Sequence, residues 1–223
     1  MKSKIIIGSI ISLITQVSFA TIDLYSTNLP PDAFPKKGYK EIMEQIAKEA
    51  KEREEKGYLE RESGYYEHYH DIENKIKYYT LASVHLKKSF SKLSLVPNLK
   101  KVPNFVKSET FGYDGVGSFN KDVGWTGVAE LFKTKASHIC HFMHNDLQAS
   151  GGGYSLSEED AQYDVNGKYT IVEVTGIPKS GFDYKVNWLD KFNDYTLTCI
   201  NKDFSPEFTQ YVINLAKEID ASW

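Results

Sequence analysis

The sequence predicts an α+β protein, with an N-terminal helical hairpin followed by an antiparallel β-sheet of about five strands that is covered by a C-terminal helix. Three observations support this prediction. Apolar residues recur at helical spacing between residues 39 and 93, and period-two alternation with many aromatic residues follows Pro103. A capped amphipathic segment then ends the chain. Separate runs of helices and strands are typical of the α+β class.

Residues 1–20, "MKSKIIIGSIISLITQVSFA", have the order of a secretory signal peptide. Two lysines precede an apolar run from Ile5 to Phe19, and Ser18 and Ala20 stand at positions −3 and −1 of a cleavage site before Thr21. A membrane anchor is the alternative, but about 15 apolar residues are fewer than the roughly 20 that cross a bilayer. We therefore expect export, to a periplasm or outside the cell, with no membrane span after cleavage.

The segment after the cleavage site divides into a leader and a helical region. Three prolines predict an extended leader over residues 21–38. Apolar residues at helical spacing then predict one helix over 39–56 and a second over 65–93, separated by glycines. An antiparallel hairpin of the two is the economical interpretation, and one long bent helix is the alternative. The predicted domains are 1–20 (signal peptide), 21–38 (leader), 39–95 (helical region) and 96–223 (sheet and C-terminal helix).

The sheet is predicted from alternation, and its cover from a capped helix. Short connections between the last three strands favour antiparallel hairpins, and Asn166-Gly167 predicts a two-residue hairpin turn at the end of a long loop, 148–167. In the last helix Ser205 is the N-cap and Pro206 occupies the first turn, ahead of a stripe of apolar residues. The predicted strands are 126–133, 137–147, 168–176, 182–189 and 194–201.

Charge and cysteine content narrow the class of protein. The 27 basic and 30 acidic residues give a net charge of −3, which becomes −5 without Lys2 and Lys4. This acidic balance argues against nucleic acid as the partner. The chain has two cysteines, Cys140 and Cys199, and in an exported protein an even number predicts a disulfide. Such a bond would prevent Cys140 from acting as a nucleophile or a metal ligand.

The stretch 136–145, "SHICHFMHND", raises the question of a metal site because it holds three histidines. As a strand, it places His138, Cys140, Phe142 and His144 on one face and Ile139, His141 and Met143 on the other. His138 and His144 are then about 20 Å apart, too far to share a zinc ion. As a helix, it would bring neighbouring histidines together. The residue types favour the strand.

His68 and His70 form a second histidine group, in "EHYHD". At helical spacing they pair with Asp71 and Glu67, and His138, His141 or His144 could complete a zinc or copper site across an interface. The alternative, which we favour, is a helix face on which the histidines bond to carboxylates. We therefore expect no cofactor and keep these five histidines as candidate metal ligands.

A basic strip lies between residues 86 and 108, where six lysines occur without an acidic residue. It could contact a protein, a glycan or an anionic surface; alternatively, the lysines only complement a helix end. The sequence has no Gly-x-Ser-x-Gly elbow and no His-Glu-x-x-His motif, and Ser89 and Lys92 have Ser-x-x-Lys spacing without its companion motifs. It therefore favours a non-catalytic exported binding module. A histidine-dependent metal-binding protein or hydrolase is the alternative. The six lysines are Lys87, Lys88, Lys92, Lys100, Lys101 and Lys107.

Overall fold

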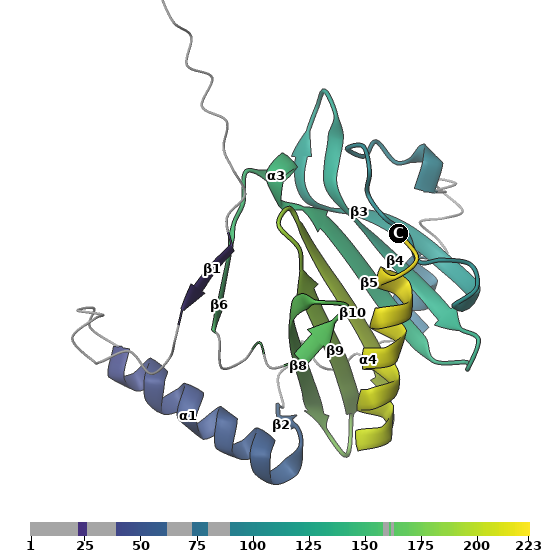
Figure 1. The fold of residues 1–223 in the computed structure, drawn as a ribbon. Helices are drawn as coiled ribbons and strands as arrows, with labels where there is room; N and C mark the ends of the chain where they lie inside the picture. Colours follow the sequence, from purple (N-terminus) through teal and green to yellow (C-terminus); the bar gives the residue numbers. More distant parts are fainter. Residues whose placement is uncertain (1–21, 26–38, 62–72, 80–89, 158–160, 162) are drawn as a thin grey trace, which may run out of the picture.

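The fold is a strongly curved sheet with one long helix packed along it (Figure 1). The computed structural model describes residues 22–25, 39–61, 73–79, 90–157, 161 and 163–223. Its α+β class agrees with the sequence, but the predicted helical hairpin followed by a five-stranded antiparallel sheet is wrong. In the described part of the chain the main sheet has eight strands and is mixed. The predicted signal peptide lies outside the described residues, as does most of the leader.

The described elements are five helical segments and ten strands. The helices are α1 (Tyr39–Lys56), a helical segment at 73–79, the 3₁₀ helix η2 (Phe90–Lys92), α3 (Leu147–Ser150) and α4 (Pro206–Asp220). The strands are β1 (Ile22–Tyr25), β2 (Leu59–Glu60), β3 (Lys107–Asn120), β4 (Gly124–Thr134), β5 (Ile139–Asp146), β6 (Tyr154–Ser157), β7 (Tyr163–Val165), β8 (Lys168–Ile177), β9 (Gly181–Leu189) and β10 (Asn193–Asn201).

The main sheet has the strand order β2-β8-β9-β10-β5-β4-β3, and β7 pairs with β8. The β2–β8 pair is parallel and the other pairs of this sheet are antiparallel. A separate parallel pair joins β1 to β6. The five strands predicted from alternation are confirmed as β4, β5, β8, β9 and β10, and the sequence missed the others.

The hairpin prediction fails at Gly57, where α1 ends. Gly57 has a positive φ of 79°, and its N–H donates to the carbonyl of Arg53, an arrangement that ends helices. The chain then enters the sheet as β2 directly after α1. Leu59 is buried and pairs with Thr175 of β8, and Tyr58 packs against Phe182. The contacts of Tyr58 and Leu59 hold this segment on the sheet. Most of the predicted 65–93 helix lies outside the described residues.

The predicted loop 148–167 contains more structure than expected, since it holds the last part of α3 and the strands β6 and β7. Its predicted turn is confirmed. Val165 of β7 pairs with Lys168 of β8, and the two residues between them have positive φ angles of 53° (Asn166) and 81° (Gly167). Positive φ at both central positions is the type I′ geometry that Asn-Gly favours.

Helix α4 packs on one face of the sheet and closes the main core. The Ser205 hydroxyl accepts the N–H of Phe208 as the N-cap, and Pro206 occupies the first turn, as predicted. The predicted stripe of α4 packs on apolar side chains from the strands. Among the described helices, none is long and apolar enough to cross a membrane. The buried α4 side chains are Phe208, Val212, Ile213, Leu215, Ala216, Ile219 and Asp220.

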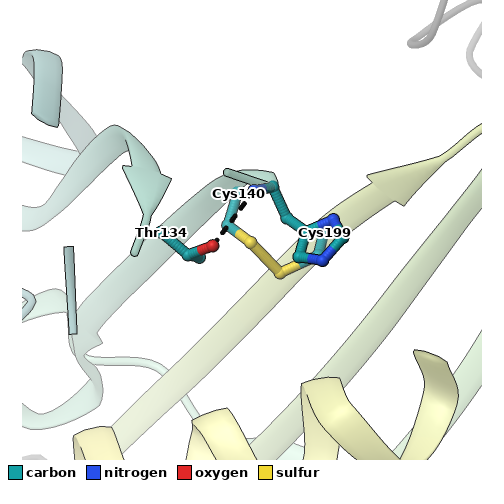
Figure 2. Close-up of a disulfide and its surroundings, with 4 residues drawn as sticks. Thr134, Cys140 and Cys199 are labelled. Atoms are coloured by element: carbon teal, nitrogen blue, oxygen red, sulfur yellow. Dashed lines mark hydrogen bonds between the residues drawn. A yellow bond between two sulfur atoms is a disulfide. The ribbon is translucent and has the colours of Figure 1, made fainter. Parts of the chain in front are cut away.

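The predicted disulfide is present beneath α4 (Figure 2). Cys140 of β5 stands directly opposite Cys199 of β10, and their Cα atoms are 4.1 Å apart. Both cysteines belong to the core cluster that α4 covers. Next to them, the N–H of His138 donates to the Thr134 hydroxyl at 3.1 Å, a bond drawn as the dashed line in Figure 2.

Candidate functional site

The two faces of the sheet differ in composition, and the candidate site lies on the face away from α4. Because side chains alternate along a strand, each central strand contributes to both faces. On β9, Phe182, Tyr184 and Val186 belong to the core under α4. Asp183 and Lys185 point to the opposite face, where they line a cavity of about 340 Å³. Small-molecule sites typically begin at about 300 Å³.

The floor of the cavity is a row of directly opposed residues on five neighbouring strands. Glu173 of β8 stands opposite Lys185 of β9, which stands opposite Thr198 of β10. Thr198 in turn stands opposite His141 of β5, and His141 opposite Leu131 of β4. At about 4.8 Å between strands, the row spans about 19 Å. All five side chains line the cavity.

The chemistry of the lining changes along this row. The charged end is formed by β8 and β9, the middle by Thr196, Thr198 and Ile200 of β10, and the apolar end by β4 and β5. The sheet register therefore builds a site with a polar end and an apolar end. The residues of the charged end are Glu173, Thr175, Asp183 and Lys185. The other end is formed by Leu131, Ile139, Cys140 and Met143, with His141 among them.

Asp183 is the most perturbed carboxyl group of the cavity. It is only 6% exposed, and burial raises its pKa from 3.8 to about 7, with a smaller opposing effect of the Lys75 charge. Burial disfavours the charged form of a carboxyl group. Asp183 therefore changes its protonation state near neutral pH, which makes it a candidate functional residue.

The helical segment 73–79 contributes two side chains to this site. Lys75 lines the cavity, and the Tyr79 hydroxyl lies 3.1 Å from Nε2 of His141. The two residues are four positions apart, so they lie on the same side of the helix. Burial raises the pKa of Tyr79 well above its ordinary value, so Tyr79 stays neutral. His141 is thus held by an uncharged hydroxyl at the apolar end of the cavity.

The predicted faces of β5 are confirmed, and they separate the histidines. His141 lines the cavity, whereas His138 packs between Phe208 and Tyr211 on the α4 face. The fourth residue on that face, His144, is buried at 1% exposure. Among the described residues no three His, Cys, Asp or Glu side chains are placed to hold a metal ion. His68 and His70 lie outside the described residues.

His144 is held by two hydrogen bonds that use both ring nitrogens. The backbone N–H of Lys100 donates to Nδ1 at 2.6 Å, and Nε2 lies 2.8 Å from Oδ1 of Asn193. Because Nδ1 accepts, Nε2 carries the proton and donates to Asn193. The ring stacks on Tyr195. Burial lowers the pKa of His144. His144 is therefore neutral and has a structural role.

The four described lysines of the basic strip differ in their surroundings. Lys92 is exposed in η2, and Lys101 lies 5.7 Å from the ring centre of Phe90. Lys107 instead forms a buried ion pair with Glu130, with side chains 8% and 1% exposed. Lys100 is half-buried beside His144. Lys87 and Lys88 lie outside the described residues.

Sequence reasoning missed the cavity because its lining comes from residues of the less apolar strand faces. Asp183 and Lys185 have the alternation of a solvent-facing row, and nothing local shows that Asp183 is buried. One feature of the sequence could have indicated the cavity. On β10, the face away from α4 carries Thr196 and Thr198 instead of charged residues. A short polar side chain between charged and apolar strands leaves space above the sheet.

Comparisons with protein-family models, with curated proteins and with solved structures find no match for this chain. Its function is therefore argued from the chemistry of its own site. That site is a cavity whose described residues combine apolar side chains, hydroxyl groups and both signs of charge.

Proposed function

We propose that this chain is an exported, non-catalytic binding module that holds a small molecule in the cavity on the open face of its sheet. The open face means the face opposite α4. The observation that carries the proposal is the cavity itself, about 340 Å³ in volume with convergent apolar and polar side chains. Concave sites with a few polar groups in an apolar lining are typical of small-molecule binding.

Two features support the binding part of the proposal. The cavity floor is formed by strands, which hold the lining side chains in fixed register, and preorganised sites lose little entropy on binding. The cavity is also reached from solvent, because Lys185 on its floor is exposed while Leu131 and Asp183 are buried. A ligand can thus enter at Lys185 and displace water from around Leu131 and Asp183.

Export is supported by two independent observations. Residues 1–20 have the order of a signal peptide, and the Cys140–Cys199 disulfide is of the kind that persists in oxidising compartments. N-terminal sequencing of the protein from its native cell should begin at Thr21. A chain that begins at Met1 and fractionates with the cytoplasm would contradict export without affecting the cavity.

The binding proposal is tested with Nile red, an uncharged apolar dye whose fluorescence rises in apolar surroundings. We expect the mature chain to bind the dye and Thr198→Phe, which fills the middle of the cavity, to abolish binding. Thr209→Phe is the matched control, because Thr209 lies on α4 at the other face and should leave binding unchanged. Dye binding that survives Thr198→Phe, or none by the unaltered chain, would overturn the proposal.

A further inference from the structure

We infer that the natural ligand is an amphipathic acid, whose anionic head lies at the charged β8–β9 end of the cavity and whose apolar tail lies on β5 and β4. This inference rests on the proposed function and specifies its ligand class. It is drawn from the polarity of the two ends, from the cation at the mouth and from the distance between the ends.

The cavity lining changes from charged to apolar in the order of the strands, from β8 to β4. Charged side chains enter the cavity from β8 and β9, and the apolar side chains Leu131, Ile139 and Met143 enter from β4 and β5. The threonines of β10 lie between them and tolerate either kind of contact. A ligand that is polar throughout would leave the apolar end badly matched, and a purely apolar ligand would leave the Lys185 ammonium without a counter-charge. An amphipathic ligand matches both ends in one orientation.

The sign of the head group follows from Lys185. Its side chain is exposed, and no carboxylate of the described residues lies within salt-bridge distance of its ammonium. Glu173 stands directly opposite on β8, and Asp194 of β10 interacts with Lys185 only through its charge. A ligand carboxylate placed there gains a charge-assisted hydrogen bond. Lys75 adds a second positive charge near Asp183.

The charged end has a net charge that depends on Asp183. Four ionisable groups line this end, namely Lys75, Lys185, Glu173 and Asp183, with His141 across the cavity. With both carboxyl groups ionised the four charges cancel. Because burial raises the pKa of Asp183 to about 7, this end becomes positive below that pH. An anionic head should therefore bind more tightly at pH 6 than at pH 8.

The length of the tail follows from the strand spacing. Three strand spacings of about 4.8 Å separate β9 from β4, so the head and the end of the tail lie about 14 Å apart. A medium-chain fatty acid such as decanoate has this length when extended. The cavity volume of about 340 Å³ also suits a single chain and excludes a two-chain lipid.

The test compares decanoate with decylamine, which has the same tail and the opposite charge, by isothermal titration of the mature chain at pH 6 and pH 8. We expect decanoate to bind more tightly than decylamine, and more tightly at pH 6. Lys185→Gln should weaken decanoate about tenfold, the effect of one charged hydrogen bond. Lys202→Gln, an exposed lysine outside the cavity, is the matched control and should not change it.

The outcomes separate this inference from the proposed function. Decylamine binding as tightly as decanoate, or decanoate binding unchanged by Lys185→Gln, overturns the inference, while Nile red still tests the cavity. If neither decanoate nor Nile red binds, the proposed function itself fails. Nile red binding by Lys185→Gln shows that the cavity of this variant is intact, so that a loss of decanoate affinity then reports on the charge.

Discussion

The two faces of one sheet carry different chemistry in this protein. The face under α4 is aromatic and aliphatic, crossed by a disulfide and closed by seven buried helix residues. The open face has charged and hydroxyl side chains around a cavity, although Asp183 and Thr175 there are also buried. Burial of apolar side chains is the main source of folding stability, and most of the buried apolar residues lie under α4, so the open face should contribute less to stability. The difference indicates that one face maintains the fold and the other leaves space for a cavity of about 340 Å³.

Removal of the disulfide should cause the largest loss of stability on the α4 face. The bond closes a loop with a sequence separation of 59 residues, and in the chain-entropy model such a loop stabilises the fold by about 4 kcal/mol. The double variant Cys140→Ala, Cys199→Ala should lose this much free energy of unfolding in a urea titration. It should still bind Nile red under native conditions, because both cysteines belong to the core under α4 and only Cys140 also borders the cavity.

A reducing agent is the control for this prediction. Dithiothreitol should destabilise the unaltered chain and leave the double variant unchanged. Equal unfolding free energies for the oxidised chain and the double variant would show that the disulfide does not stabilise the α4 face.

The next prediction compares the stability lost when two aliphatic residues of β10, Leu197 and Ile200, are changed to alanine. Leu197 is 0% exposed in the core under α4, so Leu197→Ala should cost about 3 kcal/mol through lost burial and the cavity it leaves. Ile200 is half-buried and already borders a cavity, so Ile200→Ala should cost less than about 1 kcal/mol. Urea titration of both variants measures the difference. Equal losses would mean that the two faces contribute equally to stability.

The sequence predicted the α4 face much better than the open face, and the reason is physical. Apolar alternation on β9 and β10, the Ser205 cap and the Asn166-Gly167 turn are local patterns, and each has its expected structure. Whether Cys140 meets Cys199 is a non-local question, but the chain holds only these two cysteines, which leaves one possible pairing.

The elements that the sequence missed depend on contacts between distant residues. Strand β3 pairs with β4 through three register shifts, and each shift interrupts the alternation that would reveal a strand. Its Gly115 lies against the indole of Trp125, where a Cβ would come within 2.3 Å of Cδ1. The cavity is harder still to foresee, because residues of five strands and of the 73–79 helix form it.

The open face should also show itself in the pH dependence of stability, through Asp183. Its pKa is about 7 in the folded chain and about 3.8 when solvated, so between these values the folded chain binds more protons. The free energy of unfolding therefore falls as pH rises from about 4 to 7. At about 1.4 kcal/mol per pKa unit the upper bound is about 4 kcal/mol, and water in the cavity should reduce it to about 2.

Asp183→Asn tests this prediction, since the amide has the same shape and does not titrate. The variant should gain stability relative to the unaltered chain as pH rises through this range, in urea titrations at pH 4, 6 and 8. Asp203→Asn, at an exposed position after β10, is the control and should give no such gain. A constant difference between Asp183→Asn and the unaltered chain at all three pH values would contradict the burial of this carboxyl group.

The α4 face should respond to pH with the opposite sign, through His144, and this is the smallest effect. Burial lowers the pKa of His144 below its ordinary value of 6.5, so below about pH 6.5 the unfolded chain binds the proton and the folded chain resists it. The contribution of His144 to the free energy of unfolding is therefore full above that pH and is lost as the pH falls. Protonation of Nδ1 would also break the hydrogen bond from the Lys100 N–H.

His144→Phe separates these two contributions, because phenylalanine keeps the stacking on Tyr195 and neither titrates nor accepts a hydrogen bond. The variant should be less stable than the unaltered chain at pH 7.5, and the difference should shrink as pH falls toward 5. His141→Phe, on the open face, should leave the acid-side loss in place. If the loss of stability below pH 6.5 persists unchanged in His144→Phe, the buried histidine is not its source, and the opposite pH responses cannot be assigned to the two faces.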